Sequence, residues 1–202
     1  MSRKTAAALV LLLAACSKPE TQQAAAPASP PAPARGTPEW KIQNAMSAAP
    51  ADIASGATIM DYPATPTGQP TQLRAGTNGW TCFPDLPSSP ANDPVCADAQ
   101  WLDWTNSWMA HKPPHTTAVG VAYMLQGADD ASNTDPFKEK PDSGQQWVHT
   151  GPHTMIIAPN AAHAFTGYPT TPTPGKPFVM FPNTPYAHIM VPSPGLASHG
   201  SM

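Results

Sequence analysis

Proline limits what this chain can fold into more than any other residue. Proline has no backbone N–H and interrupts helices and central strands, and the 202 residues include 28 prolines together with 13 glycines. Loops must therefore be abundant, and the helices and strands must be short. A chain of this length can bury the core of one domain, whereas two compact domains would be tight.

Charged residues are scarce, at 11% of the chain against about a quarter in ordinary soluble proteins. The net charge is −3, and without Arg3 and Lys4 the remaining 8 basic and 13 acidic residues give −5. A negative chain repels phosphate backbones, and neither a basic stripe nor a zinc-finger spacing occurs. We therefore expect no nucleic-acid partner.

The first residues, MSRKTAAALVLLLAAC, have the order of a secretory leader. A basic start precedes an apolar run, residues 6–15, that is too short to span a bilayer as a stable helix. Leu13 to Cys16 resemble the lipobox of bacterial lipoproteins. That resemblance covers the leader and Cys16 alone, and it implies that Cys16 becomes a lipidated first residue that anchors the chain to a lipid bilayer. The alternative is a plain signal peptide with an incidental cysteine.

The resemblance also carries an expectation about localisation. In bacterial lipoproteins an aspartate directly after the lipidated cysteine favours retention at the inner membrane, and this chain has Ser17 there. For a Gram-negative host, the expected place is the cell envelope, anchored to the outer membrane and facing the periplasm.

The composition divides the chain into four parts. The stretch SKPETQQAAAPASPPAPAR offers nothing to bury, and at about 3.1 Å per residue such a proline-rich tether extends up to about 60 Å. We predict a signal peptide (1–15), a lipidated cysteine with an Ala/Pro-rich tether (16–36), a single globular domain (37–195) and a flexible tail (196–202).

The two remaining cysteines form an even pair in a compartment that oxidises thiols. Cys82 and Cys96 lack the C-x-x-C spacing of redox or zinc sites, so we predict a disulfide between them. Closing a loop of this length stabilises a fold by about 3 kcal/mol in the chain-entropy treatment.

Two main helices are expected, at about 38–49 and 94–110. Thr37 is the expected N-cap of the first helix, which Pro50 ends. Asp93 is the expected cap of the second helix, which Pro113-Pro114 stops. Cys96 would then lie in its first turn, and the disulfide would tie this helix to a hairpin.

That hairpin is expected around Asn78-Gly79, a pair suited to a tight turn. The run 117–126 reads as a central strand because it is almost continuously apolar. Helices early, strands late and short connections favour an α+β domain with a mostly antiparallel sheet. The other expected strands are 57–62, 145–149, 153–158, 177–181 and 186–191.

Three indoles share one face of the second helix. Trp101, Trp104 and Trp108 follow each other at spacings of three and four, which is typical of a core-facing stripe. The alternative is an exposed platform for ligands.

Two His-x-Met segments carry the most specific chemical signal in the folded region. Strand alternation puts His153 with Met155 on one face, and His188 with Met190 on one face. If the two strands are neighbours, imidazoles and thioethers converge, with His149 nearby, and such a ligand set suits copper. If the Trp helix covers that face, the residues are core, and this is the interpretation we favour.

No nucleophile elbow, phosphate loop or dinucleotide fingerprint occurs, so those enzyme classes are excluded. The leading hypothesis is a non-catalytic envelope lipoprotein that binds an unidentified protein or small molecule. The alternatives are a periplasmic copper-binding protein and a tethered enzyme with a His/Asp site, whose catalytic residues the sequence does not specify. The aspartates considered for the latter are Asp85, Asp93, Asp98 and Asp103.

Overall fold

The structure is a computed structural model that describes residues 31–65 and 68–193. The described residues from Ala32 onwards belong to one compact unit. The expected leader, Cys16 and the tail from residue 196 lie outside the described residues.

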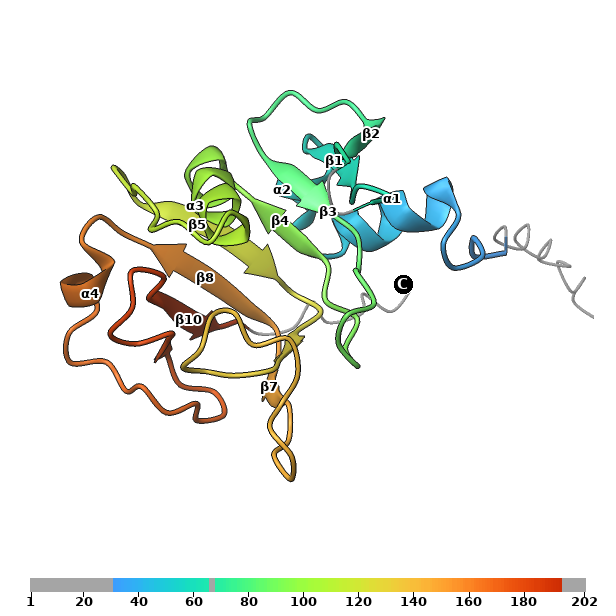
Figure 1. The fold of residues 1–202 in the computed structure, drawn as a ribbon. Helices are drawn as coiled ribbons and strands as arrows, with labels where there is room; N and C mark the ends of the chain where they lie inside the picture. Colours follow the sequence, from blue (N-terminus) through green and yellow to red (C-terminus); the bar gives the residue numbers. More distant parts are fainter. Residues whose placement is uncertain (1–30, 66–67, 194–202) are drawn as a thin grey trace, which may run out of the picture. The chain divides into compact units, whose positions relative to one another are not determined.

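The fold is α+β, with a mostly antiparallel sheet, as the sequence predicts. Eight strands follow the order β2-β1-β3-β4-β5-β8-β10-β9 across the sheet (Figure 1), and only β1 and β3 pair in parallel. Their bounds are β1 (Thr58–Asp61), β2 (Thr71–Arg74), β3 (Thr81–Phe83), β4 (Val95–Ala97), β5 (Gly120–Met124), β8 (His153–Ile157), β9 (Phe178–Met180) and β10 (His188–Pro192).

Alternation along the strands divides the core into two layers, one on each face of the sheet. Ala97 is paired with Ala122, and Ala122 with Met155, so these residues share a face, where they belong to the larger apolar cluster. Their neighbours Cys96 and Tyr123 point to the other face, where they meet the alanine-rich cluster.

The N-terminal helices cover that alanine-rich face. Helix α1 (Pro38–Met46) begins at the predicted cap, because the Thr37 hydroxyl oxygen accepts a bond from the Trp40 N–H at 3.2 Å. The helix ends at Met46, before the expected Pro50, and Pro50 instead precedes the short helix α2 (Ala51–Ala54). Small side chains let both helices approach the sheet closely.

Helix α3 (Ala99–Met109) packs on the other face, over β5 (Figure 1). The expected start at residue 94 is wrong, because residues 95–97 pair with β3 and β5 as strand β4. Asp98, and not Asp93, is the N-cap: its carboxylate accepts from the Trp101 N–H and from the Val121 N–H, each at 2.8 Å. The same carboxylate therefore joins the helix start to β5.

The expected hairpin around Asn78-Gly79 is also wrong, because β1 lies between the two strands. The segment that joins β2 to β3 crosses the start of β1, and the Thr77 N–H donates to the Gly56 carbonyl at 2.8 Å. At the crossing, a Cβ on Gly76 would lie 2.1 Å from the Thr58 nitrogen. Glycine is therefore the residue that fits there.

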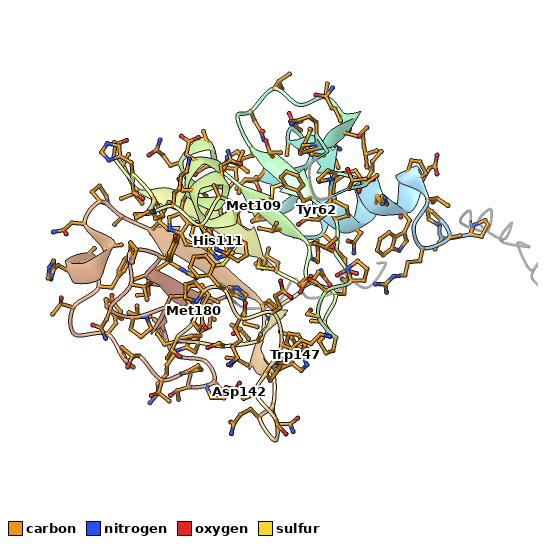
Figure 2. The ribbon with its side chains drawn as sticks, viewed as in Figure 1. Tyr62, Met109, His111, Asp142, Trp147 and Met180 are labelled. Atoms are coloured by element: carbon orange, nitrogen blue, oxygen red, sulfur yellow. A yellow bond between two sulfur atoms is a disulfide. The ribbon has the colours of Figure 1, made fainter. Side chains whose placement is uncertain are left out.

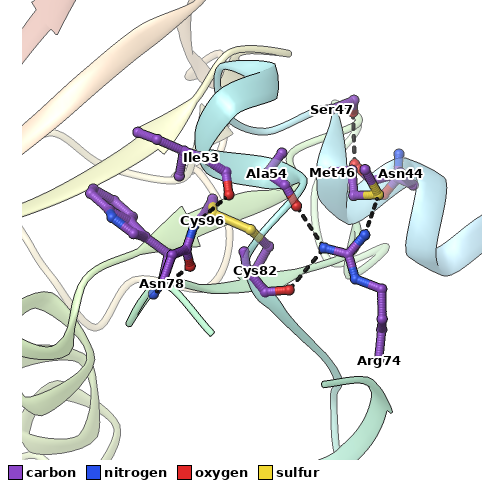
Figure 3. The surroundings of a disulfide bond; sticks show 11 residues. Asn44, Met46, Ser47, Ile53, Ala54, Arg74, Asn78, Cys82 and Cys96 are labelled. Carbon is purple, nitrogen blue, oxygen red and sulfur yellow. Dashed lines mark hydrogen bonds between the residues drawn. A yellow bond between two sulfur atoms is a disulfide. The ribbon is translucent and has the colours of Figure 1, made fainter. Parts of the chain in front are cut away.

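The predicted disulfide is present, and it joins two strands instead of a helix and a hairpin. Cys82 and Cys96 are directly opposite residues of β3 and β4, and both are fully buried. Nearby, the Arg74 guanidinium donates to the carbonyl of Ala54 at 2.6 Å, which ties the edge strand β2 to the end of α2 (Figure 3).

A second, two-stranded sheet joins β6 (Ala128–Asp130) to β7 (Val148–Thr150). The sequence predicts only the second of these strands, because Ala128–Asp130 begins a polar stretch that reads as a loop. The remaining described helix is the single turn α4 (Ala161–Ala164). The strands expected at 153–158, 177–181 and 186–191 are present as β8, β9 and β10.

Candidate functional site

The three candidate histidines occupy two different environments. His153 and His188 are buried, with 0% and 2% of their surface exposed, and they face the same side of the sheet from the neighbouring strands β8 and β10. His149 lies on β7 with 73% of its side chain exposed. The structure therefore brings the two His-x-Met segments together and leaves His149 apart from them.

His153 has one bonded and one unbonded ring nitrogen. Its Nδ1 lies 2.7 Å from the carbonyl oxygen of Gly151, and since a carbonyl only accepts, Nδ1 carries the proton. The Nε2 atom is buried and has no hydrogen-bond partner among the described residues. Burial lowers the pKa of His153 to about 4, so the ring is neutral at neutral pH and Nε2 holds a free lone pair.

His188 uses the same backbone pattern inside an aromatic enclosure. Its Nδ1 lies 3.0 Å from the Tyr186 carbonyl oxygen, two residues back. Its ring stands edge-on to Trp101, Trp104 and Phe181, with centroids 5.4 to 5.5 Å apart. Burial lowers the pKa of His188 to about 4. The ring therefore packs as an uncharged aromatic member of the core.

The two methionines of the segments are cross-strand neighbours. Met155 on β8 is directly opposite Met190 on β10, and both are buried, at 7% and 1% exposure. A third methionine, Met124 on β5, is directly opposite His153. Sequence reasoning missed Met124, whose strand carries no histidine; only the register of β5 against β8 places it beside the imidazole.

The tryptophan stripe is core, as favoured from the sequence. Trp101 and Trp104 are 4% and 6% exposed, so the alternative of an exposed ligand platform is wrong for them. Trp108 is half-buried at the edge of the same cluster, and its indole N–H donates to the Pro136 carbonyl at 2.7 Å. The helix therefore covers the face that carries His153 and Met155.

A pocket of about 580 Å³ opens beside β7, between the end of β10 and the segment before β9. Much of its wall is apolar, and its polar lining includes the Thr150 residue, whose buried hydroxyl has no partner among the described residues. The apolar lining residues are Val148, Pro152, Pro172, Pro174, Phe178 and Pro192.

His149 lines the same pocket and is oriented by a carboxylate. Its Nδ1 lies 2.7 Å from Oδ1 of Asp129, on the paired strand β6. Among the described residues, no hydroxyl or thiol side chain bonds to this imidazole, so no activated nucleophile accompanies it. Burial, with contributions from Asp93 and Asp129, raises the pKa of the adjacent Asp130 to about 7.

The four aspartates considered for catalysis do not form one site. Asp98 is the helix cap described above, and Asp103 is exposed on α3. Asp85 is buried and its Oδ1 accepts from the backbone N–H of Asp93 at 3.2 Å, so these two do meet. Burial and the neighbouring Asp85 raise the pKa of Asp93 to about 6, whereas the Ser89 hydroxyl opposes this shift.

Within residues 31–65 and 68–193, no three His, Cys, Asp or Glu side chains lie close enough together to hold a metal ion. None of the helices in these ranges has the length and apolar character needed to cross a bilayer. The structure thus shows an α+β domain with a pocket beside β7 and several methionines in its core. No protein-family model, curated protein or solved structure matches the chain.

Proposed function

We propose that the chain is a lipid-anchored binding protein of the bacterial cell envelope, whose folded domain holds a small, largely apolar molecule in the pocket beside β7. The composition of that pocket carries the proposal. Its volume of about 580 Å³ falls in the range of about 300–1,000 Å³ that is typical of small-ligand sites.

The few polar groups of the pocket support binding in a defined orientation. The imidazole of His149 is held at its Nδ1 by Asp129, which leaves Nε2 to contact a ligand. Thr150 also lines the pocket, and its hydroxyl is buried without a partner among the described residues. Proline rings and Phe178 supply a rigid apolar surface that loses little entropy on binding.

A test of the pocket fills it without disturbing the core. Thr173 is exposed and lines the pocket, so Thr173→Trp places an indole in the opening; Thr171→Trp, also exposed but outside the pocket lining, is the matched control. We expect native mass spectrometry of the protein extracted from its host envelope to show a bound small molecule in the wild type and the control, and not in Thr173→Trp. The mass of the acylated chain alone in the wild type would contradict the proposal.

The anchoring rests on the lipobox-like leader, and the buried disulfide is compatible with an oxidising compartment. We expect the wild-type chain to incorporate labelled palmitate and Cys16→Ser to incorporate none. We expect Ser17→Asp to move the protein from the outer-membrane to the inner-membrane fraction of a density gradient. Equal labelling of the wild type and Cys16→Ser would reject the lipid anchor.

A further inference from the structure

Three methionines and one histidine form a continuous patch on the face of the sheet under α3. They are Met124 on β5, His153 and Met155 on β8, and Met190 on β10; we call them the thioether cluster. Met124 is directly opposite His153, and Met190 is directly opposite Met155. Directly opposite residues have Cβ atoms about 4.5–5.5 Å apart and diagonal ones about 7–8 Å, so long side chains in this patch reach one another.

The imidazole of the cluster is arranged as a ligand. Its Nδ1 proton is held by the Gly151 carbonyl, which fixes both the tautomer and the ring orientation. This is the arrangement of metal-binding histidines, in which one ring nitrogen donates to a carbonyl and the other coordinates. Here the second nitrogen, Nε2, is fully buried and bonds to no described residue.

We infer that the thioether cluster, through Nε2 of His153 and the Sδ atoms of Met124, Met155 and Met190, binds one Cu(I) ion. Thioether donors are soft ligands that select Cu(I), and imidazole is a further donor that suits copper. The burial of Met155 and Met190, at 7% and 1% exposure, keeps water from competing for the ion.

The charge of the cluster selects a monovalent ion. All four donors are uncharged, and no three carboxylate, thiol or imidazole groups of the described residues come together elsewhere to offer a harder site. A divalent ion in this apolar layer would lack a compensating carboxylate, and the cost of burying an uncompensated charge rises with the square of that charge. Ca²⁺ and Mg²⁺ additionally require oxygen ligands, which the cluster does not contain.

The pocket beside β7 lies next to the cluster, although no cluster residue lines it. Its lining includes Gly151, which holds the His153 ring, and Pro192, which is directly opposite His153 on β10. It also includes Phe178, which is directly opposite Met190. The pocket therefore ends at the backbone that surrounds the cluster.

The other histidines named with the copper hypothesis lie outside this ligand set. Ile189 is opposite Ile156, so His188 lies level with Ile157, four positions along β8 from His153. His188 is enclosed by aromatic rings, and His149 bonds to Asp129 on the second sheet. The site does not depend on a small molecule in the pocket, so it stands if the proposed ligand-binding function fails.

Competition with a Cu(I) chelator tests the site in the full chain. The metal-free protein, purified in detergent, is mixed under ascorbate and without oxygen with Cu(I) held by bicinchoninate, whose colour fades as Cu(I) leaves. We expect the wild type to remove one Cu(I) per chain. We expect His153→Leu and the double variant Met155→Leu/Met190→Leu to bind at least tenfold more weakly, because each removes donors while keeping apolar volume.

Met60→Leu is the matched control. Met60 lies on β1, which is separated from β5 by β3 and β4, and it is half-buried away from the cluster. We expect this variant to retain wild-type affinity, and circular dichroism tests whether each variant is folded. If His153→Leu does not fold, the methionine double variant carries the test. A wild type that removes no Cu(I), or a double variant that binds like the control, overturns the site.

Silver supplies a direct view of the ligands, because Ag(I) shares the preference for soft donors and does not change its oxidation state here. In protein with ¹³C-labelled methionine methyl groups, we expect one equivalent of Ag(I) to shift the resonances of Met124, Met155 and Met190. Those of Met60 on β1 and of Met109, which is 64% exposed at the end of α3 and is labelled in Figure 2, stay in place. Shifts confined to Met109 would show surface binding and reject the cluster as the site.

Discussion

Replacing His153 by leucine tests how protonation of this buried imidazole changes the stability of the folded domain. In the unfolded chain this imidazole takes up a proton below pH about 6.5, whereas burial lowers the folded-state pKa to about 4. Its contribution to stability is therefore complete above pH about 6.5 and is lost as the pH falls towards 4. The difference of about 2.5 between the two pKa values lowers the free energy of unfolding by about 3.4 kcal/mol at low pH. About 2 kcal/mol of this is already lost at pH about 5.

Leucine removes this loss because it binds no proton in either state. At neutral pH two effects oppose each other in the metal-free protein. Removal of the unpaired buried Nε2 recovers about 1–3 kcal/mol, and loss of the Nδ1–H bond to the Gly151 carbonyl, which lines the pocket, costs about 0.5–1.5 kcal/mol. We therefore expect the variant to be as stable as the wild type or more stable at pH about 7.5.

Urea unfolding followed by tryptophan fluorescence measures these quantities. Between pH about 7.5 and pH about 5, we expect the free energy of unfolding of the wild type to fall by about 2 kcal/mol more than that of His153→Leu. His115→Leu, at an exposed position, is the control and should follow the wild type. Parallel pH profiles for the wild type and His153→Leu would refute the assignment of a neutral, buried imidazole.

Three further predictions concern the rest of the fold. Replacement of Cys82 and Cys96 by alanine removes a bridge across 14 positions and should lower the free energy of unfolding by about 3 kcal/mol in denaturant titrations without reductant; no change would mean that the bridge is dispensable. Asp130→Asn should stabilise the protein at pH 8 and leave its stability unchanged near pH 4. Burial raises the pKa of this carboxyl to about 7, so its ionisation at pH 8 opposes folding. Calorimetric melting temperatures at both pH values test this. Gly76→Ala should destabilise by about 1–3 kcal/mol or more, since the added Cβ meets backbone atoms, and Gly151→Ala, with open space around its Cβ, should not.

The two proposals concern adjoining parts of one edge of the molecule and make different demands on it. A small molecule in the pocket needs the exposed imidazole of His149 and the open space lined by prolines. Cu(I) needs the buried face behind Gly151 and Pro192. The Thr173→Trp variant acts on the first and the methionine variants act on the second, so the outcomes can be told apart.

Signals confined to a few neighbouring residues predicted local structure well. Thr37 is the cap of α1, Cys82 and Cys96 form the disulfide, and the His-x-Met segments are strands. Each of these features depends on the chemistry of a side chain near its own backbone or on alternation along one strand. The burial of Trp101 and Trp104 follows in the same way from helical spacing.

Pairing between distant segments required the tertiary structure. Asn78-Gly79 has the residues of a hairpin turn, yet β1 lies between the strands it joins, because contacts with the helices of the alanine-rich face outweigh the local preference. Likewise, Pro94 and Asp93 resemble a helix start, but residues 95–97 complete the sheet between β3 and β5. Backbone hydrogen bonds to both neighbouring strands, β3 and β5, stabilise the strand conformation there.

The candidate sites show the same division. From the sequence alone, His153 with Met155 and His188 with Met190 each share a strand face, and the compartment predicted from the leader suits copper. Only the register of β5, β8 and β10 showed that Met124 is opposite His153, that Met155 is opposite Met190 and that His188 lies four positions from His153. Only the pairing of β6 with β7 showed that His149 contacts Asp129. Strand register is set by packing between residues far apart in the chain, and a slip of one position would turn every one of these side chains to the opposite face.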